Sequence, residues 1–274
     1  MRGTLVRSLL AIPVAVLSLA PRALPAQAHP PALPADLAAE RAAFAEWLAT
    51  APVSPAAAVS AAALGADGVT LDANGHGVRV LERAGVPWVE GDGPARPLAR
   101  NRPVRVGRVT VLVTGEPPRS RIMMFQPGRA APAPAYYPYD PALVFAGSLV
   151  PPAVPGSERV LTPDGVEVEA SEAGTVSFDL RGRRVLKVLR LPDPASGESS
   201  LEVYVRDSTS GAGSYPAGRF VTLTPLGGGR YRLDFNRARN PFCAYNAAYP
   251  CPAPWRGNTV PAAIRAGERY ESHP

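Results

Sequence analysis

Histidine and lysine are scarce in this chain of 274 residues, and their scarcity excludes much familiar active-site chemistry. A catalytic triad needs a His held beside its nucleophile. Of the three His, His29 is expected to begin the mature chain and His273 is the penultimate residue, whereas His76 lies in an Asn-Gly-His-Gly turn typical of an exposed residue. A Schiff-base enzyme would need the single Lys187, which lies in an alternating strand pattern and is expected to face solvent.

Several sequence motifs are also missing. The chain has no phosphate-binding GxxxxGK[ST] loop, no GxGxxG and no HExxH. These absences disfavour nucleotide hydrolysis, Rossmann-type redox chemistry and zinc proteolysis, and the sequence indicates no particular cofactor. The remaining chemistry uses carboxylates, amides, Arg and Tyr. It suits carbohydrate or anion binding, carboxylate-based glycoside chemistry, or an oxygen-rich calcium-type site.

Charge is sparse as well. Charged residues make up 19% of the chain and apolar residues 46%, which favours a folded domain over a disordered chain. The formal charge is +6, but residues 1–28 hold three Arg and no acid, so their removal leaves +3. That small excess disfavours nucleic acid as a partner. The basic run 181–184 is expected to be a solvated hairpin turn.

Residues 1–28 have the pattern of a secretory signal peptide. Arg occurs twice in the first seven residues, the run from Leu9 to Ala20 is apolar, and Ala26-Gln27-Ala28 forms a small-x-small cleavage site. The apolar run contains Pro13 and is shorter than the roughly 20 residues of a membrane span. We therefore expect cleavage before His29, a periplasmic or secreted protein, and no membrane span after cleavage.

The two cysteines, Cys243 and Cys251, stand eight positions apart in a chain that is expected to be exported. Such a pair favours a disulfide, and closing this short loop would stabilise the fold by roughly 2.6 kcal/mol on the chain-entropy model. Two free thiols, or a metal or redox site, are the alternatives. A structural zinc needs about four ligands, and only His76, far away in sequence, could add one. The sequence therefore predicts a disulfide and assigns no metal ligand.

One helix is expected near the N-terminus of the mature chain. After the Pro- and Ala-rich residues 29–35, residues 36–49 predict a helix that Asp36 can cap. Its apolar residues fall on one face, namely Leu37, Phe44 and Leu48, with Trp47 beside them. Pro52 ends the helix, and residues 53–66 are rich in Ala and give no clear pattern.

From residue 68 the apolar residues alternate, which is the period of a strand. Residues 68–72 and 77–82 predict a hairpin across Asn74-Gly75, and residues 103–115 predict one long strand or a pair around Gly107. Further strands are expected at 121–126, 166–171, 175–182, 184–191, 201–207, 218–226 and 230–236. The last two are expected to pair across three glycines, whereas 127–141 and the chain after Arg237 should be irregular.

This pattern predicts a mainly β fold, a sandwich or a barrel-like sheet of about ten short strands with one N-terminal helix. The 25 Gly and 33 Pro agree with many turns and short elements. We expect three parts: the signal peptide 1–28, an N-terminal helix with an Ala- and Pro-rich segment at 29–66, and a β-rich domain at 67–274.

Polar residues concentrate between 206 and 268, at the expected strand ends where loops meet. They are Asp207, Thr209, Tyr215, Arg219, Asp234, Asn236, Asn240, Tyr245, Asn258 and Glu268. Such side chains suit oxygen-rich coordination, or fork hydrogen bonding by Arg219. The alternative is structural, because Asp207 and Thr209 can make turn hydrogen bonds and Asp234 can satisfy backbone amides where a strand ends.

Three segments of this region carry a resemblance to a family. They are D-x-T-S-G…S-Y-P-A-G-R-F from Asp207 to Phe220, L-D-F-N-x-A-x-N-P-x-C-A-Y from Leu233 to Tyr245, and C-P-x-P…A-G-E from Cys251 to Glu268. Together they resemble the domain of unknown function 1684 family, and the resemblance extends over about residues 36–270. Members commonly carry Pro where this chain has Phe242. The resemblance implies no mechanism, because it brings no assigned activity.

Three functions stay open at this point, and with them the question of whether the chain is an enzyme. The first is a binding module for a small polar or anionic ligand, held by Asp207, Thr209, Tyr215, Arg219, Asp234, Asn236, Asn240, Asn258 and Glu268. The second is a carboxylate hydrolase with Asp207 or Asp234 as base or nucleophile and Glu268 as acid. The third is a structural cluster without chemistry, in which Arg219 pairs with Asp234 or Glu268.

Overall fold

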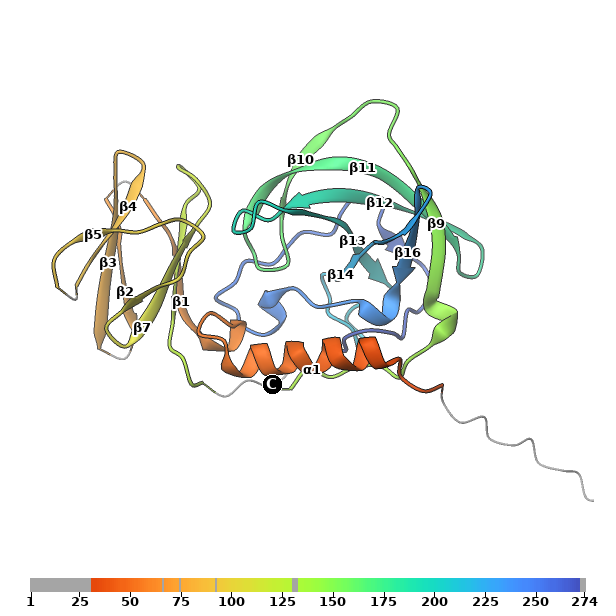
Figure 1. Ribbon diagram of the computed structural model, residues 1–274, viewed down its shortest axis with the longest axis horizontal. Helices are drawn as coiled ribbons and strands as arrows, with labels where there is room; N and C mark the ends of the chain where they lie inside the picture. The colour runs from red at the N-terminus through yellow and green to blue at the C-terminus, as the bar shows by residue number, and fades with distance from the viewer. Residues whose placement is uncertain (1–30, 66, 74, 92, 130–132, 272–274) are drawn as a thin grey trace, which may run out of the picture. The chain divides into compact units, whose positions relative to one another are not determined.

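The computed structural model describes residues 31–271, apart from residues 66, 74, 92 and 130–132. The predicted signal peptide, His29 and His273 lie outside the described residues, as does the side chain of His76. The described part of the chain is mainly β with one N-terminal α-helix, as the sequence predicts (Figure 1). It contains seventeen strands rather than about ten, because some expected strands are divided and others have no clear pattern.

Helix α1 spans Ala35–Thr50, one residue beyond the expected helix at each end. Leu37 and Leu48 are buried, so the apolar face read from the sequence is the face that packs. The described residues also contain four short 3-10 helices: η1 (Pro55–Ala57), η2 (Pro141–Leu143), η3 (Phe235–Arg237) and η4 (Phe242–Ala244).

Asp36 does not cap this helix. The N-cap position is Pro34, which makes no side-chain cap hydrogen bond, and Asp36 lies in the first turn. Its carboxylate pairs there with Arg237, a residue from the far end of the chain. The first turn still favours a carboxylate, because the unpaired N–H groups at a helix start carry partial positive charge.

The strands between residues 58 and 125 form two four-stranded antiparallel sheets, ordered β1-β8-β7-β6 and β2-β3-β4-β5. The strands are β1 (Ala58–Ala63), β2 (Val69–Ala73), β3 (His76–Arg83), β4 (Val86–Glu90), β5 (Arg96–Pro97), β6 (Val104–Val106), β7 (Val109–Thr114) and β8 (Arg121–Phe125). Alternate residues such as Val78 and Val80, and Val111 and Val113, meet in one apolar core that both sheets share. We call this part the N-terminal sandwich.

The sequence predicts much of the N-terminal sandwich. The expected hairpin is the pair β2–β3, and residues 103–115 form two paired strands around Gly107 rather than one long strand. The Ala-rich segment without a clear pattern contains β1, which pairs with β8 and therefore becomes part of the sheet. Alanine has a low strand propensity, so β1 depends on its partner rather than on its own composition.

The remaining strands form a nine-stranded sheet that curves into a half-barrel (Figure 1). They are β9 (Val144–Val150), β10 (Ser157–Leu161), β11 (Glu167–Asp179), β12 (Arg183–Pro192), β13 (Ser199–Asp207), β14 (Arg219–Thr222), β15 (Thr224–Gly227), β16 (Arg230–Asp234) and β17 (Thr259–Val260). Their main order is β14-β13-β12-β11-β9-β16-β15, with β10 on β11 and β17 parallel to β13.

Two expectations about this sheet need correction. Residues 166–171 and 175–182 are one strand, β11, because a bulge between Glu172 and Gly174 absorbs the polar interruption. Residues 218–226 are two strands, because the chain changes partner at Leu223: β14 pairs with β13, and β15 pairs with β16 across the glycine turn. The alternation of apolar residues continues unchanged when a chain passes from one paired strand to another, so the sequence pattern does not reveal the change.

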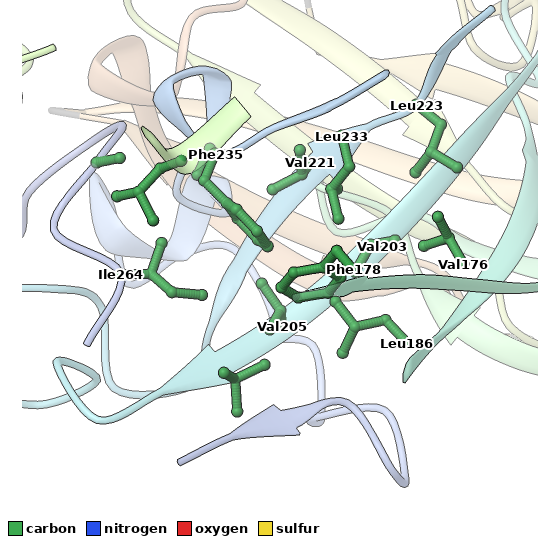
Figure 2. Close-up of a cluster of buried hydrophobic side chains, with 14 of the residues drawn as sticks. Val176, Phe178, Leu186, Val203, Val205, Val221, Leu223, Leu233, Phe235 and Ile264 are labelled. Atoms are coloured by element: carbon green, nitrogen blue, oxygen red, sulfur yellow. The ribbon is translucent and has the colours of Figure 1, made fainter. Parts of the chain in front are cut away.

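Both faces of the sheet are covered. Figure 2 shows the inner core, where side chains of β11 to β14 meet Leu233, Phe235 and Ile264. On the other face a second cluster holds Tyr204 and Trp255 among others. The segment from 237 to 271 is nearly free of regular structure, as expected, and it packs against both clusters through side chains. Among the described residues, no helix has the length and apolar character to cross a membrane.

Candidate functional site

Arg219 and Asp207 form a buried ion pair at the centre of the predicted polar cluster. Arg219 Nη2 lies 2.9 Å from Asp207 Oδ2, and both side chains are almost fully buried. The same guanidinium donates to the backbone carbonyls of Ile264, Ala266 and Glu268. One side chain therefore binds three backbone carbonyls of an irregular segment. It can do so because the planar guanidinium presents several N–H donors in fixed directions.

The other oxygen of Asp207 is equally engaged. Asp207 Oδ1 accepts hydrogen bonds from the amide and hydroxyl of Thr209 and from the amide of Ile264. The expectation that Arg219 pairs with Asp234 or Glu268 is therefore wrong, because Asp207 already neutralises it. Both side chains are sealed, and the terminal nitrogens of Arg219 and both oxygens of Asp207 have partners, although Arg219 Nε has none among the described residues. The pair therefore has the arrangement of a structural centre.

Two asparagines of the cluster each bond to the amide and the carbonyl of one distant backbone residue. Asn258 accepts from the amide of Lys187 at 2.8 Å and donates to its carbonyl at 2.9 Å. Lys187 lies just beyond the end of the β12–β13 pairing, so the Asn amide completes the ladder. Asn236 bonds in the same way to the amide and carbonyl of Asp140. Buried backbone groups need such partners.

Asp234 ends its strand by accepting from the backbone amide and the side-chain amide of Asn236. Its second oxygen lies 3.5 Å from Arg237. Both Asp207 and Asp234 are thus held in local hydrogen bonds, which leaves neither as a free base beside Glu268. This arrangement disfavours the carboxylate hydrolase.

Glu268 is the buried carboxyl of the cluster that borders a cavity. Its Oε2 accepts from the amide of Asn240 and from the hydroxyl of Tyr245. Burial raises the pKa of Glu268 to about 7, although these two hydrogen bonds and the charges of Arg239 and Arg219 act to lower it. The cavity beside it has a volume of about 140 Å³, so it has room for only a few waters.

Gly267 makes this placement possible. Its φ is +72°, and a Cβ there would stand 2.5 Å from the carbonyl oxygen of Ala238. The absence of a side chain allows the chain to approach η3 closely and lets the amide of Glu268 donate to Ala238. The A-G-E sequence of the family resemblance thus has a steric explanation.

Tyr215 lies between the two cysteines. Its hydroxyl oxygen is 3.1 Å from Cys243 Sγ and 3.2 Å from Cys251 Sγ. The two thiols are close but not bonded to each other. Burial, and next the neighbouring Cys251 thiol, raise the pKa of Cys243 to about 12, so it is not a reactive thiolate at neutral pH.

A second cavity, of about 570 Å³, lies beside the cluster. We call it the main cavity. Its walls are mostly aromatic and aliphatic, and its lining includes Phe44, Trp47, Phe242, Tyr249, Leu112 and Met123. Trp47 of α1 and Phe242 of η4 lie with ring centroids 5.6 Å apart, which ties the helix to the cluster.

Charged side chains interrupt these apolar walls. Glu202 of β13 lines the main cavity and is almost fully buried. Its Oε1 accepts from Arg239 at 2.9 Å and from Thr222 at 2.8 Å, whereas its Oε2 has no hydrogen-bond partner within the described part of the chain. Arg239 also lines the small cavity of Glu268, so it connects the two spaces.

Of the predicted site residues, the structure brings most into one network but only Asn236 and Glu268 border the small cavity, and none borders the main cavity. The residues of the main cavity were not singled out as site residues. The sequence pattern assigns Phe44 and Trp47 only to the apolar packing side of the helix. Glu202 gave one usable signal, a carboxylate inside an otherwise apolar strand.

No group of three or more His, Cys, Asp and Glu is placed to hold a metal ion among the described residues. The oxygen ligands of the cluster are used instead by backbone amides and by Arg219.

The C-terminal half of the chain matches a family model. Residues 133–269 match the family described as protein of unknown function (DUF1684). The chain belongs to this family. A solution NMR structure of an uncharacterized protein from Haloarcula marismortui is 36% identical, covering 50% of this chain and 76% of its own, with a TM-score of 0.43. No curated protein matches the chain.

The DUF1684 segment includes strands β9 to β17 and the whole polar cluster. It also includes Glu202, Arg239 and the cavity walls Phe242 and Tyr249. Helix α1 and the N-terminal sandwich lie outside the match and supply the other walls of the main cavity.

Proposed function

We propose that this protein is a binding module whose main cavity holds a small molecule with a largely apolar body. The volume of about 570 Å³ and the aromatic and aliphatic walls carry this proposal. Small-molecule sites are typically concave, of about 300–1,000 Å³, and mostly apolar with a few polar groups that orient the ligand. Glu202 and Arg239 are polar groups of that kind.

The sequence predicts a small polar or anionic ligand at the cluster itself. The hydrogen bonds of Arg219 and Asp207 favour a structural role for these two residues instead, since their charged groups already have partners within the protein. The cluster then holds in place the segment that carries Arg239 and η4. A ligand in the main cavity contacts residues next to the cluster rather than its centre.

A binding titration with 3-methylindole, a neutral aromatic probe, tests the proposal. We expect saturable binding by calorimetry, and a loss of about ten-fold or more when Val53→Phe fills the cavity. Val185→Phe is the matched control, because Val185 is exposed on β12 and does not line the cavity. Equal binding by both variants would contradict the proposal, as would a native protein that binds neither this probe nor its charged analogues such as tryptophan.

We further propose that the protein is exported and that its cysteines form a disulfide in the oxidising compartment. The charged start, the apolar run and the cleavage site of residues 1–28 support export. The approach of both sulfurs to the hydroxyl of Tyr215 supports the pairing, because it brings the two cysteines to the same side chain. Intact mass of the protein recovered from a periplasm would test both: a chain that starts at His29 and lacks two hydrogens is expected.

A further inference from the structure

We propose that the ligand of the main cavity is a zwitterion with an apolar side chain, such as an aromatic α-amino acid, whose ammonium meets Glu202 and whose carboxylate meets Arg121. This inference rests on the proposed function and names the class of ligand. It depends on two groups of opposite charge that line one cavity: the buried Glu202, whose Oε2 has no hydrogen-bond partner among the described residues, and the half-buried Arg121, whose Nε has none.

The acceptor is Glu202 Oε2. The side chain of Glu202 is 2% exposed, and its other oxygen is fixed by Arg239 and Thr222. A buried carboxylate oxygen without a hydrogen bond is costly, and a ligand N–H group would satisfy it. An ammonium is favoured over a neutral donor because charge-assisted hydrogen bonds are stronger.

The donor is Arg121, at the start of β8 in the N-terminal sandwich. It is half-buried, its Nε is buried, and within the described part of the chain it has no hydrogen-bond or ion-pair partner. Its guanidinium suits the two oxygens of a carboxylate. Arg121 and Glu202 do not pair with each other, so one ligand can reach both only if it carries both charges.

The space between these groups is apolar and aromatic. Trp47, Phe242 and Tyr249 offer ring faces, which attract both an aromatic side chain and an ammonium. Asp164 and Asp193 add two further carboxylates to the lining. A purely anionic ligand would pair with Arg121 but leave Glu202 Oε2 without a donor, and a purely cationic one would leave Arg121 unpaired.

A matched series of indoles tests the inference by calorimetry at neutral pH. The series is L-tryptophan, tryptamine, indole-3-propionate and 3-methylindole. The first three differ only in the ammonium and carboxylate that they carry, and 3-methylindole carries neither charge and lacks the second side-chain carbon. We expect tryptophan to bind at least about ten-fold more tightly than either singly charged analogue, as one charge-assisted hydrogen bond provides.

Two variants assign the contacts. Glu202→Gln keeps an oxygen for Arg239 and should weaken tryptophan and tryptamine by about ten-fold while indole-3-propionate is unchanged. Arg121→Gln should weaken tryptophan and indole-3-propionate in the same way and spare tryptamine. Arg183→Gln, exposed on β12, is the control that should change none of the four.

The outcomes separate this inference from the proposed function. If the four indoles bind equally, or a singly charged analogue binds best, the zwitterion is excluded while cavity binding stands. If 3-methylindole does not bind and the charged indoles also fail, the proposed function itself is overturned. Should one variant not fold, the other variant and the series on the native protein still decide between these results.

Discussion

The N-terminal sandwich and the C-terminal cluster are both buried, but by different chemistry. Between β1 and β8 the buried polar residues are Thr110, Thr114 and Ser120, and none of them is charged. Between 202 and 268 the buried residues include two Asp, two Glu and one Arg. The sandwich is therefore held mainly by apolar packing within regular sheets, with one half-buried ion pair between Arg100 and Glu82. The cluster is held by side chains that bond to the backbone of an irregular segment.

This difference predicts different responses to substitution. Apolar packing is non-directional, so a small truncation removes a small part of the stabilisation. A buried ion pair is satisfied only as a whole, because removing one partner leaves the other charge uncompensated. The irregular segment 237–271 also has few strand ladders of its own, so its backbone depends on these particular side chains.

The largest effect should come from Arg219→Met. This change leaves Asp207 unpaired and frees three backbone carbonyls, so we expect a loss of about 3–5 kcal/mol in the free energy of unfolding. Denaturant unfolding followed by fluorescence measures it. Arg265→Met, at an exposed position in the same segment, is the control and should cost little. A loss below about 1 kcal/mol for Arg219→Met would contradict the structural role.

The next effect concerns pH. The pKa of Glu268 in the folded state is raised to about 7, above its ordinary value of 4.5. Between these two pH values the carboxyl is therefore protonated in the folded state and ionised in the unfolded state. The contribution of Glu268 is fully present below pH 4.5 and is lost as the pH rises through about 7, by about 3 kcal/mol. Glu268→Gln should lack this fall. The measurement is the difference between the two stability curves from pH 4 to 8, and parallel curves would refute the burial argument.

A smaller effect is expected for Asn258→Ala. The change leaves the amide and the carbonyl of Lys187 without partners at the end of the β12–β13 ladder, so we expect a loss of about 2 kcal/mol. Hydrogen exchange of the Lys187 amide should become faster at the same time. Unchanged exchange at this amide would show that the asparagine does not complete the ladder.

The smallest effect should come from Ile122→Val in the N-terminal sandwich. Ile122 is fully buried on β8, so removing one methylene should cost about 1 kcal/mol. Val86→Ala, at an exposed position on β4, is the control within the same sandwich. A loss as large as that of Arg219→Met would remove the contrast between the two regions.

Much of the fold could be predicted, because local patterns report local structure. The helix 36–49 follows from its apolar face, and the strands of β3, β7, β12 and β13 follow from alternation. The segment of β1 was not predictable, since six residues of mostly Ala become a strand only beside β8. The change of paired strand at Leu223 could not be predicted either, because the alternation of apolar residues does not identify the neighbouring strand in the sheet.

The candidate site was predicted only in part. The polar residues between 206 and 268 do meet, as their positions at strand ends suggest. Their roles could not be read from type alone, since an Arg with free N–H groups and an Arg that gathers three carbonyls look the same in sequence. The main cavity was missed because its walls come from α1, η4, β13 and the N-terminal sandwich.

The sequence by itself determined that this protein is mainly β with one helix, that its polar residues gather near the C-terminus, and that it belongs to DUF1684. Only the tertiary structure decided which charges are paired and which are left open. On β13 the alternation places Glu202 opposite the apolar face of Leu201 and Val203, where solvent is the default. The irregular C-terminal chain covers that face and brings Arg239 to it. Because a segment distant in sequence buries the charge of Glu202, the residues next to Glu202 in the sequence do not indicate the burial.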